Sequence, residues 1–207
     1  MKAAVLYSGG KDSSLMATIL DKFGYDVELI TINFGLFDSS IPAAKSAKNL
    51  GFKHKVITLN REILDDAVDM IIEDNFPNNG INYIHHQAIE YVAAQYDVIA
   101  DGTRREDRIP KLTMSEIQSL EDRLDVQYLN LTGIGYKTVN DISDEIFELE
   151  KKESDIYNSS DYEMEVRVLL KQKGCSIDEI FPQHIQSKVI GWKIKWVEIK
   201  IYHKKQD

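Results

Sequence analysis

Short apolar runs alternate with helical patterns along most of the chain, and this alternation constrains the fold more than any other feature. Buried strands are predicted at Ala3–Tyr7, Val27–Phe34, Lys55–Leu59, Val98–Ala100 and Gln127–Thr132. Between these runs, apolar residues recur at the spacing of amphipathic helices, most clearly over residues 63–72. Because parallel strands need a crossover helix, the alternation indicates βαβ units. The sequence therefore predicts a doubly wound parallel sheet in a three-layer α/β/α domain.

The last quarter of the chain has a different pattern and predicts a small appendage. Its segments read as a polar linker, a helix and a terminal strand, over residues 151–162, 163–173 and 192–201. A further helix is predicted just before them, from Thr138 to about Glu150. We therefore expect an α/β domain over residues 1–150 and a C-terminal extension over residues 151–207 that packs on it.

Charge and cysteine content exclude several classes of protein. The 25 Lys and Arg against 34 Asp and Glu give a net charge of −9, which disfavours a nucleic-acid partner bound through its phosphates. Cys175 is the single cysteine, so a disulfide framework and cysteine zinc clusters are excluded. The apolar run at the start is too short for a signal peptide, and no window approaches the ~20 apolar residues of a membrane span. We expect a cytoplasmic protein with no membrane partner.

The strongest chemical signal joins the first predicted strand to the first helix, in Ser8-Gly9-Gly10-Lys11-Asp12-Ser13-Ser14. The glycines let the backbone turn and approach a ligand closely, and the helix start offers unpaired N–H groups to an anion. The hydroxyls and Lys11 suit phosphate, and Asp12 suits a Mg²⁺ ion that bridges phosphates. A Walker A loop is excluded, because Asp12 follows Lys11 and Val5 stands at the upstream glycine position. The alternative is an ordinary turn that caps the helix.

This segment resembles the PP-loop of the adenine-nucleotide α-hydrolase superfamily, the N-type ATP pyrophosphatases, whose pattern is Ser-Gly-Gly-x-Asp-Ser/Thr. The residues that match are Ser8, Gly9, Gly10, Asp12 and Ser13. The resemblance covers the motif and the architecture over about residues 1–140, and it implies a HUP-type, Rossmann-like sheet. Members of the superfamily cleave ATP between the α and β phosphates and transfer AMP to a carboxylate or carbonyl oxygen. A nitrogen or sulfur nucleophile then displaces the AMP.

The resemblance also implies roles for individual residues. The matched residues would hold the pyrophosphate and its Mg²⁺, with Ser14 beside them. Lys11 occupies a variable position and would help to neutralise phosphate charge. The adenine would lie against the end of the second strand, where backbone groups of Asn33 and Phe34 would bind the edge of the base.

A second candidate cluster, Asp101–Arg108, follows the fourth predicted strand. It lies at the edge where open α/β sheets bind ligands. Several relatives have a Gly-Thr pair at an equivalent strand end, and Gly102-Thr103 matches it. Asp101 and Asp107 are candidates to share Mg²⁺ with Asp12. Two neighbouring arginines, Arg104 and Arg105, are candidates to stabilise charge on the α-phosphate. The alternative is a solvated loop with internal ion pairs.

Three other segments have both a functional and an ordinary interpretation. The glycines within residues 131–138 either approach an acceptor substrate or form a common turn. A tail over residues 181–193 either delivers Lys188 or His184 to the nucleotide or is a plain loop. The pair His85-His86 points in directions about 100° apart on a helix, so the two rings do not readily share a metal ion. We expect one of these histidines at the surface and the other half-buried.

Absent features narrow the predicted reaction. Lys2 stands where glutamine-using relatives carry a catalytic cysteine, and one cysteine leaves no pair for the sulfur relay of many tRNA-thiolating relatives. The chain is similar to small stand-alone PP-loop proteins of the asparagine-synthase-related type. We therefore expect an ATP pyrophosphatase that uses ATP and Mg²⁺ to adenylate a small carboxylate or carbonyl acceptor.

Two alternatives stay open, and they predict different partners. The first is a protein that binds ATP or AMP without cleaving it, and the second is a tRNA-modifying enzyme that uses an external sulfur carrier. A homodimer through the terminal strand or through residues 78–97 is compatible with the sequence, which does not require one.

Overall fold

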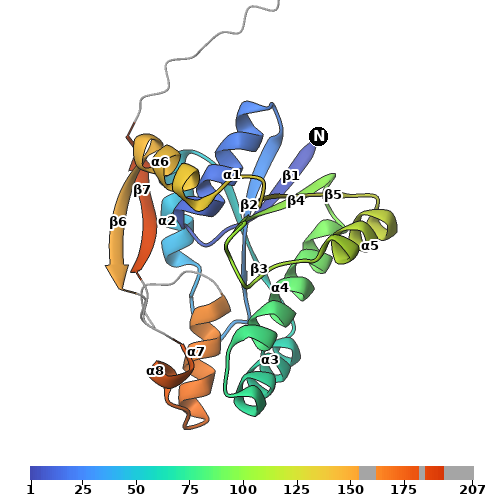
Figure 1. The fold of residues 1–207 in the computed structure, drawn as a ribbon, viewed down its shortest axis with the longest axis vertical. Helices are drawn as coiled ribbons and strands as arrows, with labels where there is room; N and C mark the ends of the chain where they lie inside the picture. Colours follow the sequence, from blue (N-terminus) through green and yellow to red (C-terminus); the bar gives the residue numbers. More distant parts are fainter. Residues whose placement is uncertain (154–161, 182–184, 194–207) are drawn as a thin grey trace, which may run out of the picture.

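A five-stranded parallel sheet forms the centre of the computed structural model, which describes residues 1–153, 162–181 and 185–193 (Figure 1). Its strands are β1 (Lys2–Leu6), β2 (Asp26–Asn33), β3 (Lys53–Thr58), β4 (Val98–Arg104) and β5 (Gln127–Leu131). Their order is β3-β2-β1-β4-β5, with every neighbouring pair parallel. The predicted doubly wound sheet is confirmed. Because the winding reverses between β1 and β4, the crevice at their carboxyl ends is where such a sheet binds ligands.

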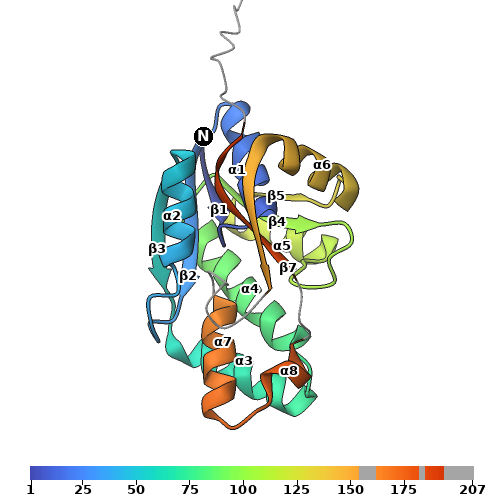
Figure 2. The same cartoon turned by 90° about the vertical axis from the view of Figure 1, so that its left-hand side faces the viewer.

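Helices cover both faces of this sheet (Figures 1 and 2). One face packs against α1 (Lys11–Lys22), α2 (Ile41–Leu50) and α6 (Tyr136–Ile146). The other packs against α3 (Arg61–Asp74), α4 (Asn78–Ala93), α5 (Met114–Leu124) and α7 (Tyr162–Gln172), with the short α8 (Ile177–Ile180) beside α7. The three layers bury β1, β2 and β4 on both faces, which is why these strands are largely apolar, whereas the edge strand β3 is mostly exposed and carries polar residues.

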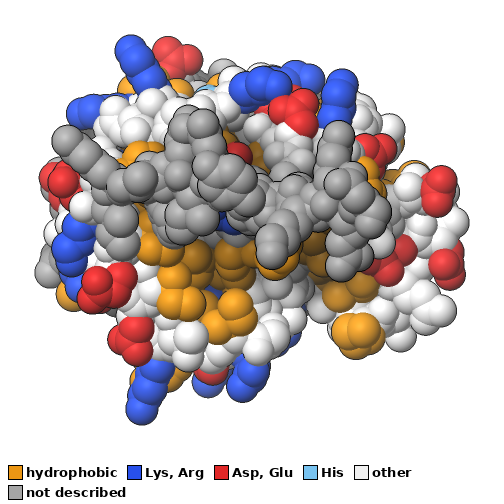
Figure 3. All heavy atoms as spheres, turned by 90° about the horizontal axis from the view of Figure 1, so that it is seen from above, with side chains coloured by type: hydrophobic (Ala, Val, Ile, Leu, Met, Phe, Trp, Pro, Cys, Tyr) orange, Lys and Arg blue, Asp and Glu red, His pale blue; other side chains and the backbone are white. Residues whose placement is uncertain are grey.

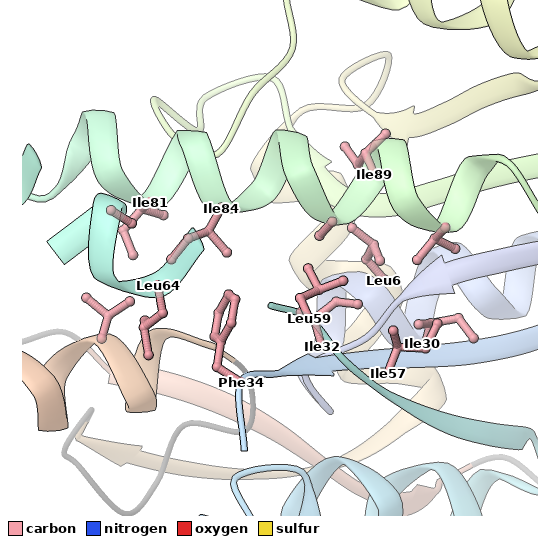
Figure 4. Close-up of a cluster of buried hydrophobic side chains, with 14 of the residues drawn as sticks. Leu6, Ile30, Ile32, Phe34, Ile57, Leu59, Leu64, Ile81, Ile84 and Ile89 are labelled. Atoms are coloured by element: carbon pink, nitrogen blue, oxygen red, sulfur yellow. The ribbon is translucent and has the colours of Figure 1, made fainter. Parts of the chain in front are cut away.

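The core between the sheet and α4 is built from branched aliphatic side chains. Figure 4 shows Leu6 and Ile32 of the central strands facing Ile84 and Ile89 of α4. The helices α3 and α4 approach each other closely at Gly80, because a Cβ atom at this position would lie 2.3 Å from the carbonyl oxygen of Ala67. A glycine is therefore required where the two helices cross.

The C-terminal elements differ from the prediction. The helix predicted to reach Glu150 ends at Ile146, and a strand, β6 (Phe147–Glu153), follows it. Phe147 and Leu149 pack on the core while Glu148 between them is exposed, so a two-residue period takes over from the helical one. β6 pairs antiparallel with β7 (Ile185–Trp192), and Figure 2 shows this pair outside α1 and α2.

The strand β7 lies within residues 181–193, for which the sequence left open a tail that reaches the nucleotide or a plain loop, and the structure has a strand over most of this segment. The strand predicted over residues 192–201 lies outside the described residues except at its first two positions, as do residues 154–161 of the predicted linker. The helix predicted over residues 163–173 is confirmed as α7. The proposed boundary between residues 150 and 151 falls inside β6, and the division into domains stays a prediction.

The end of the molecule at which β1 begins carries mixed charges around its rim and hydrophobic side chains near its middle (Figure 3). Met1 and Phe23, which lie at this end of the sheet, are the kind of exposed apolar side chain that monomers tolerate singly. Within residues 1–153, 162–181 and 185–193, no helix combines the length and apolarity needed to cross a membrane.

Candidate functional site

The loop between β1 and α1 has the backbone geometry of an anion site. Gly9 has a φ of 78°, in the left-handed region, and a Cβ atom there would lie 3.3 Å from the Cα of Ala43. The helix α1 then begins at Lys11, and Gly10 at its N-cap supplies no side-chain hydrogen bond. The first-turn N–H groups of α1 are therefore presented to a ligand at the positive end of the helix dipole.

The second candidate cluster packs directly beneath this loop. A Cβ atom at Gly102 would lie 2.5 Å from the backbone nitrogen of Ser13 and 2.8 Å from the carbonyl carbon of Asp12. The end of β4 and the start of α1 thus touch through backbone atoms, which only a glycine at position 102 permits. The structure brings together the two segments that the sequence analysis selected.

A cavity of about 560 Å³ opens over this junction. From the PP-loop and α1 it is lined by Ser8, Gly10, Lys11, Asp12 and Ser13. From the β4 region it is lined by Gly102, Thr103, Arg104 and Asp107, and from β7 by residues 185–188. Apolar side chains of Leu6, Ile30, Ile32 and Ile81 form another part of the wall. A cavity with one charged side and one apolar side suits a ligand with the same division.

The charged side combines cations with carboxylates. The Nζ of Lys11 lies 2.5 Å from Asp12, and Nε of Arg104 lies 3.6 Å from the other oxygen of Asp12. Arg104 also donates to Asp107 at 2.7 Å, and this hydrogen bond raises the pKa of Arg104 and keeps it cationic. The two cations can bind phosphate oxygens, and the two carboxylates can bind Mg²⁺. The residues present therefore fit a magnesium–polyphosphate ligand.

The strand β7 contacts the PP-loop through its backbone. The N–H of Val189 donates to the carbonyl oxygen of Gly9 at 3.0 Å, and Lys188 forms an antiparallel bridge with Gly10. Lys188 also lines the cavity. Of the two residues that this segment was expected to deliver, the structure brings Lys188 to the site, whereas His184 lies outside the described residues.

Ser14 and Arg105 were predicted as site residues but do not line the cavity. Ser14 is fully buried, and its hydroxyl donates to the carbonyl oxygen of Gly10 at 2.8 Å and lies 3.1 Å from the hydroxyl of Tyr7. Arg105 points towards the loop after β5, where it donates to the carbonyl oxygens of Thr132 and Gly133. Ser14 therefore stabilises the start of α1, and Arg105 stabilises a neighbouring loop.

The end of β2 is occupied from within the protein. The N–H groups of Phe34 and Leu36 donate to the carboxylate of Glu165 in α7 at 2.7 and 2.8 Å. Burial raises the pKa of Glu165, and these backbone donors oppose that rise. Neither Asn33 nor Phe34 lines the cavity, and the N–H group of Phe34, which was expected to bind the edge of the base, donates to Glu165 instead. The sequence offered no local signal for Glu165, which lies 131 positions from Phe34.

Asp101 is part of a buried hydrogen-bond network. Its Oδ2 lies 2.9 Å from Nε2 of His85 and accepts from the hydroxyl of Tyr128 at 2.7 Å, while its Oδ1 accepts from the N–H of Thr103 at 2.8 Å. Burial by itself raises the pKa of Asp101, but the hydrogen bonds from His85, Tyr128 and Thr103 outweigh it and lower the pKa below its usual value.

These contacts change the predicted metal site. No group of three or more His, Cys, Asp or Glu side chains within the described ranges is placed to hold a metal ion. The side chain of Asp101 is only 3% exposed, whereas those of Asp12 and Asp107 are 27% and 24% exposed, so Asp101 does not join them in a three-carboxylate site. Asp12 and Asp107 remain the candidate magnesium ligands. His85 is buried and His86 is partly exposed, so both lie deeper than the expected arrangement of one surface and one half-buried histidine.

Comparison with known proteins identifies the family of this chain. A family model described as "Family of unknown function (DUF7411)" matches residues 1–191. The chain belongs to this family. The DUF7411 protein is 53% identical to Uncharacterized protein MJ0690 of Methanocaldococcus jannaschii over 194 residues, which is 93% of this chain and 97% of the relative.

A solved structure shares the whole fold of the DUF7411 protein. It is described as a predicted subunit of tRNA methyltransferase from Methanocaldococcus jannaschii. The two structures agree with a TM-score of 0.88 at 52% sequence identity, over 94% of this chain and 98% of the other. The fold of this chain is therefore shared with a solved protein over 94% of its length.

A shorter match supports the superfamily. The tRNA-specific 2-thiouridylase MnmA of Syntrophomonas wolfei is 38% identical over 69 residues, which is 33% of this chain and 20% of the relative. Thiolating enzymes of this kind are among the PP-loop proteins that the loop sequence resembles. The match, the Ser-Gly-Gly-x-Asp-Ser sequence and its strand–loop–helix setting together support placing the DUF7411 protein in the PP-loop superfamily.

Proposed function

We propose that the DUF7411 protein binds ATP with Mg²⁺ at the PP-loop and transfers AMP to a small carboxylate or carbonyl acceptor, releasing pyrophosphate. The observation that supports this most strongly is the position of the loop. It lies at the switch point between β1 and β4 and opens into a cavity with cations, carboxylates and an apolar wall. The resemblance to asparagine-synthase-related members favours a carboxylate as the acceptor.

In this proposal each side of the cavity has a task. The N–H groups at the start of α1 and the Ser13 hydroxyl would hold phosphate oxygens, while Lys11 and Arg104 offset the negative charge that builds up as the α–β bond breaks. Asp12 and Asp107 would hold Mg²⁺, which supplies further charge neutralisation on the phosphates. Lys188 from β7 adds a third cation to the lining.

The apolar wall is the proposed place for the adenine. Ile30 and Ile32 line the cavity from β2, and Ile81 lines it from α4. A flat aromatic base buries apolar surface when it lies against branched aliphatic side chains of this kind. We therefore propose that the adenine lies along Ile30 and Ile32. These residues come four and two positions before Phe34, whose N–H group already donates to Glu165.

Phosphorus NMR of ATP incubated with the protein and Mg²⁺ tests the proposal, with a small-metabolite extract added as the source of acceptor. We expect AMP and pyrophosphate, and we expect Asp12→Ala to abolish both products. Asp21→Ala is the matched control, because Asp21 lies on the same helix, is 47% exposed and pairs with Lys22. That control should retain the activity of the wild type.

Each other outcome has a distinct meaning. ADP and orthophosphate as products would contradict cleavage between the α and β phosphates. Tight binding of ATP or AMP with no products in any extract would favour the alternative of a protein that holds the nucleotide without cleaving it. Absence of both binding and turnover would refute the proposal.

Action on tRNA is the second candidate, because a relative and a solved structure carry tRNA in their descriptions. The net charge of −9 opposes this candidate, since binding to a phosphate backbone depends on cationic surface. A mobility-shift titration with tRNA at increasing salt concentration tests it. Binding that weakens steeply with salt would favour tRNA as the acceptor, and no binding at low salt would exclude it.

A further inference from the structure

A chain of hydrogen bonds leads from the buried end of β4 into the cavity. Asp101 lies 2.9 Å from Nε2 of His85, and Nδ1 of the same ring lies 3.2 Å from the hydroxyl of Tyr162. The three residues come from β4, α4 and α7, and all three line the cavity. The chain therefore connects a buried carboxylate to a tyrosine hydroxyl at the cavity wall.

The chemistry of the three groups determines which atom donates and which accepts in each of these hydrogen bonds. An ionised carboxylate only accepts hydrogen bonds, so Nε2 of His85 carries a proton and donates it to Asp101. Asp101 stays ionised because the donors His85, Tyr128 and Thr103 lower its pKa despite its burial. In the neutral ring Nδ1 then holds the lone pair, and the hydroxyl of Tyr162 is its donor.

A purely structural role does not require polar side chains at these buried positions. His85 and Asp101 are 4% and 2% exposed, and burying polar groups is costly unless every one of them is hydrogen-bonded. Apolar residues would fill the same space between β4 and α4 without that requirement. A carboxylate that orients an imidazole, which in turn contacts a hydroxyl, is the arrangement that activates a hydroxyl for proton transfer.

We propose that Asp101, His85 and Tyr162 form a proton relay, in which Tyr162 meets the nucleophile that attacks the adenylated acceptor. This inference rests on the proposed function. Tyr162 is the catalytic residue in this proposal, and His85 and Asp101 are positioning residues that act through it. The nucleophile is the nitrogen or sulfur group that the PP-loop resemblance implies, an amine or a thiol, and either group loses a proton when it attacks an acyl carbon.

The proposed step is balanced in protons and electrons. The nucleophile forms a bond to the acceptor carbon with its electron pair, and its proton passes to the phenolic oxygen of Tyr162. The hydroxyl proton of Tyr162 passes at the same time to Nδ1 of His85, and the resulting imidazolium is stabilised by Asp101. The bond between the carbon and the AMP oxygen breaks, and AMP leaves with its electron pair. His85 returns the proton to solvent through Tyr162 after the products leave.

Acetylation of tyrosines by N-acetylimidazole tests the relay without any nucleotide or acceptor. The full chain is treated, and peptide mass spectrometry gives the acetylation rate of each tyrosine. Tyr91 and Tyr136, which are 52% and 44% exposed, are internal references. We expect Tyr162 to react faster than both references at the same pH.

Two variants identify the cause of that reactivity. His85→Gln and Asp101→Asn should each lower the acetylation rate of Tyr162 about 100-fold, the lower end of what a positioned general base contributes. The rates of Tyr91 and Tyr136 should not change. Circular dichroism checks the fold of both variants, and Asp101→Asn keeps the shape of the side chain if His85→Gln does not fold.

The outcomes separate the relay from the proposed function. If Tyr162 reacts no faster than the references, or if neither folded variant slows it, the relay is refuted whatever the protein does with ATP. If Tyr162 shows the expected reactivity but calorimetry detects no binding of ATP with Mg²⁺, the proposed function fails and the relay stands. Protection of Tyr162 by bound ATP would support both.

Discussion

Gly102→Ala is the substitution whose effect follows most directly from the structure. The new Cβ atom would lie 2.5 Å from the backbone nitrogen of Ser13, whereas ordinary contacts begin at 3.4 Å. The start of α1 therefore has to move by about 0.9 Å, because neither β4 nor α1 offers a flexible side chain that could yield. Overpacking of this kind costs about 1–3 kcal/mol, which lowers Tm by about 2–4 °C for each kcal/mol in a domain of this size.

The same displacement moves the phosphate-binding groups. A shift of about 1 Å at a site that depends on orientation costs about 100-fold in rate, so we expect Gly102→Ala to lower AMP formation about 100-fold. Scanning calorimetry measures the change in Tm, and phosphorus NMR measures the products. Gly133→Ala is the matched control, because its Cβ atom would have no neighbour within 4 Å and the residue has no positive φ. Equal Tm and equal AMP formation in the two variants would refute the argument.

Three further predictions concern stability. Gly80→Ala should lower the free energy of unfolding by at least about 2 kcal/mol in urea titrations, since its Cβ atom would lie 2.3 Å from the carbonyl oxygen of Ala67. Phe147→Ala should lower the free energy of unfolding by about 3–5 kcal/mol, because Phe147 is 1% exposed and its ring centroid lies 5.3 Å from that of Trp192. A loss under 1 kcal/mol would show that this side chain does not anchor the β6–β7 pair. Asp101→Asn should destabilise the protein at pH 7, and the gap from wild type should close in acid. The folded state lowers the pKa of Asp101, so its carboxylate stabilises the fold above about pH 4, and this contribution is lost as the pH falls through the folded pKa. Urea titrations at several pH values measure the difference in the free energy of unfolding between the variant and the wild type. A difference that stays constant down to pH 2 would contradict the reasoning.

The central sheet was predictable because its signals are local. The strands on each side of α1 are buried on both faces, so they appear as continuous apolar runs, and the helices between them keep a clear apolar stripe. The PP-loop was predictable for the same reason. Its glycines and its acid are consecutive, and the topology of a parallel sheet brings Gly102 of the fourth strand to the same edge.

The rest of the site depends on contacts that no local pattern records. Glu165 binds the end of β2 from a helix far along the chain, and β7, which pairs with β6, contacts Gly9 through Val189. The neighbouring residues Arg104 and Arg105 point in different directions, towards the cavity and towards the loop after β5. Spacing along the chain does not predict which of the two faces a ligand.

The hydrogen bond from Val189 to Gly9 has a consequence for the order in which the protein matures. The two residues are about 180 positions apart, so this contact belongs to the slow, non-local class. At about 5–20 residues per second, the ribosome makes Gly9 roughly 10–35 s before Val189. A nascent chain therefore exposes a phosphate loop that still lacks its partner strand. Under the proposed function, full affinity for a nucleotide then arises only after the end of β7 has been synthesised and has folded back.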